Sequence, residues 1–206
     1  MISRREVLKG VVAGTAAFAL SKVTGPMAWA SGHGGHGEGK VVSPQEAIAR
    51  LRTGNQRYVS MNRLSDPGVG PKAREPLTKG QWPYATILSC SDSRVPPELI
   101  FDEGLGRLFI VRVAGNMLAP ALLGSIETPG INDIVNRLMP AVLKAQKDTG
   151  LHGKKLVEAA AKENVRMTVK QIADESEPLR KMQARGELKI VGGYYSLSTG
   201  KVDIWA

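Results

Sequence analysis

Three residues able to do chemistry stand close together in the stretch SCSDSRVPPELIF, which begins at Ser89. Cys90 is the single cysteine of the 206-residue chain, and Asp92 and Arg94 follow it at alternate positions. A thiolate serves as nucleophile or metal ligand, a carboxylate serves as ligand or base, and an arginine pairs with a carboxylate. The spacing therefore predicts half of a chemical site, whose other half must come from elsewhere.

Three interpretations of Cys90 are open. A nucleophile needs a histidine nearby or a phosphate-binding loop; only His152 lies in the folded body, and Pro96 and Pro97 remove amide donors from the loop. Cys90 could also be a small buried hydrophobic residue that needs no partner, as a lone cysteine usually is. A metal ligand would use Asp92 as a second ligand or as a hydrogen-bond partner.

The segments around these residues predict an α/β fold. YATILSC (84–90) and RLFIVRVAG (107–115) are short apolar runs typical of buried strands, the second alternating around Arg112. Cys90 then falls at the carboxyl end of a strand, where open α/β sheets bind ligands. The same patterns predict an amphipathic helix opened by Ser43-Pro44, a surface wrap, four more helices and two final strands, at 43–60, 62–83, 119–127, 131–148 with a break near Pro140, 155–176, 178–186 and 188–206.

The first 30 residues have the layout of a bacterial export signal. Arg4 and Arg5 precede the apolar run GVVAGTAAFAL, and Ala28-Trp29-Ala30 supplies a small-residue cleavage site. The apolar run is too short to span a bilayer stably. We therefore expect twin-arginine export to the periplasm or beyond, no stable membrane insertion after cleavage, and a folded domain at 43–206.

The leader at 31–42 carries a second candidate site. Cleavage after Ala30 would place His33 third from the new amine, where one amine, two backbone amides and an imidazole can close around a metal. Such planar nitrogen coordination suits Cu(II) or Ni(II). The alternative is a flexible glycine-rich linker, as SGHGGHGEGK suggests.

The charge pattern does not favour nucleic acid as a partner. The formal net charge is +9, but lysines and arginines are spread along the chain and aromatic residues make up 5%. A solvated basic surface explains this pattern better than a groove that tracks phosphates or stacks bases.

A family resemblance is carried by CSDSRVPPELIFDEGLGRLFIVRVAGN (90–116), which is similar to the first signature of the β-class carbonic anhydrases. These are zinc enzymes that interconvert carbon dioxide and bicarbonate. The resemblance covers most of residues 43–205, through SPQEAIARLRTGNQRYVS, LLGSIE, GINDIVNRLMPAVLKAQ and KIVGGYYSLSTGKVDIW. It implies a mostly parallel β-sheet flanked by helices, CO₂ and bicarbonate as substrates, and a homodimer in which the 43–60 helix packs across the partner.

The resemblance also implies roles at the site. Cys90 corresponds to a zinc ligand, and Asp92 either ligates zinc or pairs with Arg94 to orient the zinc-bound water that attacks CO₂. The remaining ligands of the family come from a later H-x-x-C. This chain has none, because the residue three after His152 is Lys155.

The missing motif coincides with a gap. Glu127 runs directly into TPGINDI, where the family has a central strand and the H-x-x-C loop, on the order of 30 residues. We therefore expect the strand at 84–90 to pair directly with 188–195, and zinc binding at Cys90 and Asp92 to be weak or absent. Three hypotheses remain: a site completed by His152, a metal-poor binding or structural dimer, and a deletion in an otherwise ordinary enzyme.

Overall fold

The computed structural model of the protein describes residues 15–21, 42–64, 68–116 and 131–205. The helix predicted at 119–127 lies outside these residues. The elements, in chain order, are β1 (Thr15–Ser21), α2 (Pro44–Val59), α3 (Pro71–Leu77), β2 (Ala85–Cys90), α4 (Pro97–Ile100), β3 (Leu108–Val113), η1 (Ala114–Asn116), α5 (Ile131–Thr149), α6 (Gly153–Glu175), α7 (Glu177–Ala184), β4 (Leu188–Tyr195) and β5 (Val202–Trp205). Among them, no helix is both long and apolar enough to cross a membrane.

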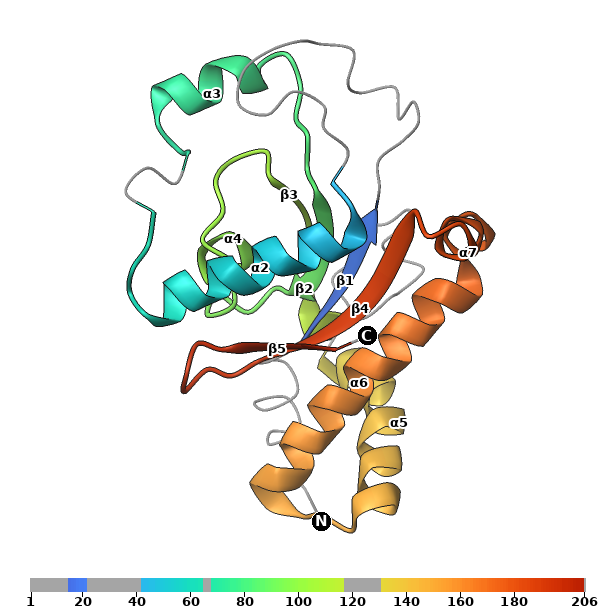
Figure 1. Ribbon diagram of the computed structural model, residues 1–206. Helices are drawn as coiled ribbons and strands as arrows, with labels where there is room; N and C mark the ends of the chain where they lie inside the picture. The colour runs from blue at the N-terminus through green and yellow to red at the C-terminus, as the bar shows by residue number, and fades with distance from the viewer. Residues whose placement is uncertain (1–14, 22–41, 65–67, 117–130, 206) are drawn as a thin grey trace.

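The strands form one five-stranded sheet in the order β3-β2-β1-β4-β5 (Figure 1). β2 and β3 are parallel, with Ala85 opposite Leu108 and Cys90 opposite Val113. The other three pairs are antiparallel, and two of them involve β1.

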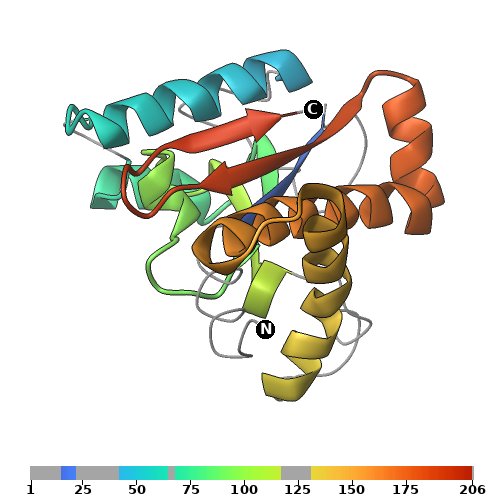
Figure 2. The same ribbon diagram turned by 90° about the horizontal axis from the view of Figure 1, so that it is seen from below.

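Helices cover both faces of this sheet, with α2 on one side and α5 and α6 on the other (Figure 2). Between α2 and the sheet lies a core that includes Leu51, Ile87 and Val191, each at most 1% exposed. A second core joins α5 to α6 through Leu138 and Leu156. The predicted α/β fold with helices flanking a sheet is confirmed, as are the strands within 84–90 and 107–115. The parallel pairing expected for most of the sheet occurs in the β2-β3 pair, while the other three pairs are antiparallel.

The expected direct pairing of 84–90 with 188–195 is wrong, because β1 lies between β2 and β4. A sheet that lacks its middle strand exposes two facing rows of backbone N–H and C=O groups, which are costly to leave unpaired. The segment Thr15–Ser21 pairs with both rows. The central position is therefore filled by residues that the sequence analysis assigned to the export signal.

The break predicted near Pro140 is also wrong, since α5 continues through this proline to Thr149. A proline inside a helix removes one amide hydrogen bond and crowds the preceding turn. Leu138 and Ala141, on either side of it, are 0% and 1% exposed. Burial on both sides of Pro140 holds the helix together across the lost bond.

The helix expected at 43–60 is confirmed, and it packs on the core of its own chain. The Ser43 hydroxyl caps α2 by accepting a hydrogen bond from the Glu46 amide at 3.2 Å. Asn55 donates to the carbonyls of Ile100 and Gly200 at 3.1 and 2.8 Å. α2 is thus fixed to α4 and to the turn before β5 within the same chain, and the wrap at 62–83 contains the short helix α3.

Candidate functional site

Cys90 ends β2, where the chain leaves the sheet. Its side chain is 0% exposed, and the amide of Ser91 donates to the carbonyl of Val113 at 3.1 Å, which extends the parallel pairing by one residue. The amide of Asp92 then turns back and donates to Cys90 Sγ at 3.4 Å. The loop therefore folds the Asp92 backbone against the thiol at the end of β2.

Asp92 and Arg94 form a closed pair. Arg94 donates from its amide and from Nε to Asp92 Oδ1, at 2.9 and 3.0 Å, and from Nη2 to Oδ2 at 2.7 Å. These bonds hold the pKa of Asp92 below its ordinary value and keep the carboxylate charged. Both carboxylate oxygens are engaged, so this carboxylate must leave Arg94 before it can bind a metal through them.

Arg112 is a site residue that sequence reasoning did not identify as one. Its guanidinium donates to the carbonyl of Cys90 at 2.9 Å and to the carbonyl of Asp92. These two bonds fix the turn from β2 into the loop, so Arg112 holds the backbone that carries the thiol and the carboxylate. The available signal was a charged residue within the apolar run of β3.

The described residues supply no third ligand beside Cys90 and Asp92. No group of three or more histidine, cysteine, aspartate or glutamate side chains that could hold a metal occurs among them. His152 is exposed and lies before α6, so the structure does not bring it to Cys90. A zinc centre requires at least three protein ligands. The described residues therefore do not fit one, and a cysteine–histidine nucleophile is equally unsupported.

A second polar cluster lies at the opposite end of β2. Tyr84 donates from its hydroxyl to Glu103 Oε1 at 2.7 Å, and Arg107 approaches Glu103 at 3.8 Å. Burial raises the pKa of Glu103 despite these partners, and burial followed by the nearby Glu103 charge raises the pKa of Tyr84. The whole length of β2 separates this cluster from Cys90, so the two do not form one site.

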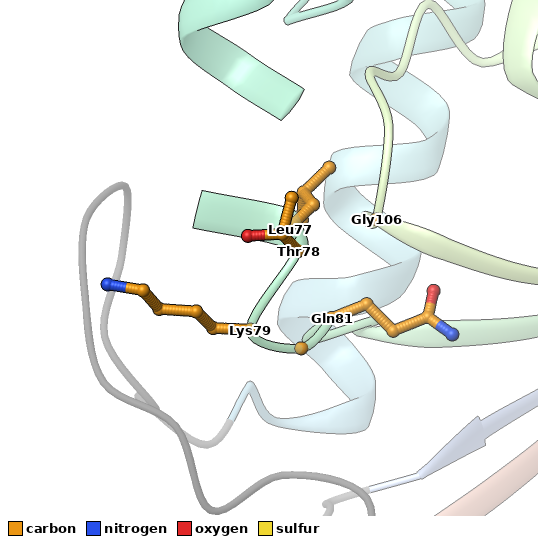
Figure 3. A pocket seen from close by; sticks show the side chains of 6 residues that line it. Leu77, Thr78, Lys79, Gln81 and Gly106 are labelled. Atoms are coloured by element: carbon orange, nitrogen blue, oxygen red, sulfur yellow. The ribbon is translucent and has the colours of Figure 1, made fainter. Parts of the chain in front are cut away.

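A shallow pocket of about 390 Å³ lies beside Gly106, just before β3 (Figure 3). Gly106 lines the pocket and lies just before β3. Because the first residues of β2 and β3 pair with each other, the pocket lies at the start of β2, whereas Cys90 lies at its end. It is lined by Leu77, Thr78, Lys79, Gly80, Gln81 and Gly106. This lining holds no acid, histidine or cysteine, so the pocket adds nothing to the chemistry of Cys90.

His33 lies outside the described residues, and its copper site stays a prediction. We expect the processed chain, beginning at Ser31, to bind Cu(II) in a square plane. Copper titration followed by the visible d–d band should show a site that the His33→Ala variant lacks. Equal affinity of both proteins for copper would eliminate it.

Comparisons with known proteins agree on one family. The family model for carbonic anhydrase matches residues 85–129 and 121–202. Carbonic anhydrase 2 of Mycobacterium tuberculosis is 32% identical over 194 residues, which cover 77% of this chain and 91% of the relative. Carbonic anhydrase of Mycolicibacterium smegmatis is 32% identical over 197 residues, covering 79% and 93%.

One solved structure has a similar fold. The solved structure of the β-carbonic anhydrase CcaA superposes with a TM-score of 0.54 at 23% identity, covering 77% of this chain and 87% of that chain. It shares the α/β arrangement described above, while the sequence matches supply the family. This chain therefore belongs to the β-carbonic anhydrase family.

Proposed function

We propose that this chain is a carbonic anhydrase homologue whose zinc site is incomplete, and that it hydrates CO₂ at or near the uncatalysed rate. One observation carries this proposal. Cys90 and Asp92 stand together at the end of β2, and the described residues bring no third ligand to them. CO₂ and bicarbonate are the substrates that family membership suggests.

Neither of the two possible zinc ligands is free to bind a metal. Cys90 is fully buried, and the Asp92 carboxylate is only 12% exposed and is held by Arg94. A metal would have to displace the guanidinium from Asp92 and would still lack the closed ligand set that makes structural and catalytic zinc tight.

The alignments support an internal gap as the reason. The match to the M. tuberculosis relative extends over 194 positions, but 77% of 206 residues is only about 159. About 35 aligned positions therefore face no residue of this chain, close to the gap inferred after Glu127. The family model likewise matches in two separate pieces, which overlap at residues 121–129.

We expect purified, dialysed protein to hold well under one zinc per chain. The physical reason is the two-donor set at Cys90 and Asp92. Elemental analysis gives the stoichiometry, and stopped-flow CO₂ hydration gives the rate, which should equal that of buffer.

Two variants make this test decisive. Near-stoichiometric zinc with a hydration rate abolished by Cys90→Ser would overturn the proposal. If His152→Ala abolished the same activity, the site would be completed by His152, and if it did not, the missing ligands would come from another part of the chain.

A metal-poor homodimer is the alternative role. It is favoured by β3, an edge strand in which Phe109 is 46% exposed, since exposed apolar edges invite pairing with another chain. We expect a dimer at micromolar concentration by light scattering, and a monomer under these conditions would contradict this role. Twin-arginine export to the periplasm remains our proposal for where the protein acts.

A further inference from the structure

The central strand of the sheet, β1, comes from a segment that lies before the domain expected at 43–206. β1 pairs antiparallel with β4 along its whole length, from Thr15 opposite Tyr194 to Ser21 opposite Leu188. On its other side, Ala16 to Ala19 pair antiparallel with Ser89 to Thr86 of β2. β1 is therefore hydrogen-bonded on both edges, as a central strand is (Figure 1).

The strands on either side are built for a covered, central position. Five of the six residues of β2 and six of the eight of β4 are buried. If β1 were removed, these strands would face each other across a space one strand wide, about 10 Å at the usual interstrand spacing. The remaining pairs, β3-β2 and β4-β5, would each be a two-stranded unit, which is marginally stable alone.

The occupant suits the space. The segment TAAFALS has no charge, proline or glycine, so every residue can donate to a ladder and none must be solvated. Its position in the sheet is fixed by two independent registers, since Ala17 stands opposite both Leu88 and Gly192.

We propose that the space between β2 and β4 is a strand-binding site for an extended apolar peptide, occupied in the unprocessed chain by its own Thr15–Ser21. Recognition is by strand addition, in which the backbone ladders supply affinity and the apolar side chains supply selectivity. The proposal does not rest on zinc or on CO₂ hydration.

The proposal couples folding to processing. Thr15–Ser21 overlaps the apolar run of the expected export signal at residues 15–20, so this segment cannot complete the sheet and serve as an extended signal at the same time. Cleavage after Ala30 would remove the occupant and leave the site open to the same peptide supplied in trans.

The test uses the full chain with one backbone donor removed from β1. Ala17→Pro should lower the melting temperature by about 10 °C, because proline cannot join a central ladder. Adding the peptide GTAAFALSK, residues 14–22, should recover at least half of the loss, whereas GTAPFALSK should recover none. The matched control is Val12→Pro, which lies in the same apolar run but outside β1 and should leave the melting temperature within about 2 °C of wild type.

Equal melting temperatures for Ala17→Pro and wild type would overturn the proposal, as would recovery by the proline peptide. If Ala17→Pro does not fold, a cross-link in a Cys90→Ser background decides. Ala19 stands opposite Ile190, so the pair Ala19→Cys and Ile190→Cys should form a disulfide under mild oxidation. Ala19→Cys with Gly193→Cys, three positions out of register, should not, and equal cross-linking of both pairs would refute the site.

Discussion

Replacing Gly54 with alanine is expected to destabilise the protein by at least about 3 kcal/mol. In an ordinary helix the same change stabilises by about 1 kcal/mol. The sign reverses here because a Cβ at Gly54 would lie 1.8 Å from the carbonyl oxygen of Phe101, a backbone atom that cannot turn aside. α2 would have to lift away from α4, which also breaks the bond from Asn55 to Ile100.

Chemical denaturation of the two proteins measures this effect. Gly70→Ala is the matched control, since a Cβ at that glycine meets no atom within 4 Å. We expect the control to unfold near the wild-type denaturant concentration. A wild-type midpoint for Gly54→Ala would mean that α2 does not pack on Phe101 as described.

The second large effect is expected at Asp102, whose side chain is 0% exposed. Arg57 donates to its Oδ2 at 2.6 Å, and Arg63 donates to its Oδ1 at 3.1 Å. Asp102→Asn should cost about 3 kcal/mol, because two guanidinium groups lose the buried charge that compensates them. Asparagine keeps the shape and tolerates the φ of 49° at this position. It removes the charge and also replaces one of the two acceptor oxygens with an amide donor, which adds to the expected loss.

This contribution depends on pH in a defined direction. Burial raises the pKa of Asp102, but the hydrogen bonds from Arg57, the Leu64 amide and Arg63 outweigh it and hold the pKa below the ordinary 3.8. The charge therefore stabilises the fold above about pH 4, and this stabilisation is lost as the pH falls through the folded-state pKa.

Unfolding curves at several pH values test this. The gap in unfolding free energy between wild type and Asp102→Asn should be constant near neutrality and shrink below pH 3.8. The control is Asp148→Asn, which removes an exposed pair with Lys144 and should not change the melting temperature measurably. A gap that stays constant down to pH 2 would contradict the assignment.

Most of the fold was predictable because its signals are local. Apolar runs marked β2 and β3, and the Ser43-Pro44 cap marked the start of α2. The central strand was not predictable for a physical reason, since TAAFALS is as good an apolar signal core as it is a strand. The place of this segment in the sheet is decided by pairing with residues 86–89 of β2 and 188–194 of β4, which are far from it in the sequence.

The site divides in a similar way. The Cys90, Asp92 and Arg94 cluster was predictable because it lies within one turn of chain, where spacing fixes proximity. Arg112 acts across the parallel ladder from the next strand, and no local pattern shows which carbonyl it contacts. His152 was a candidate partner of Cys90 because it is the one histidine predicted in the folded body. The fold does not place it beside the thiol, and no local sequence pattern could have shown this.

The position of β1 in the sheet also delays the completion of folding until β4 has been synthesised. Ser21 pairs with Leu188, so the first strand to leave the ribosome must wait for 167 further residues before β4 exists. At bacterial synthesis rates this takes roughly 10–30 s, far longer than the formation of a helix or hairpin. Throughout that interval the N-terminal segment has no completed sheet to join. If Thr15–Ser21 belongs to an export signal, as we propose, the speed of synthesis as well as the strength of pairing decides whether it meets the export machinery or its own sheet first.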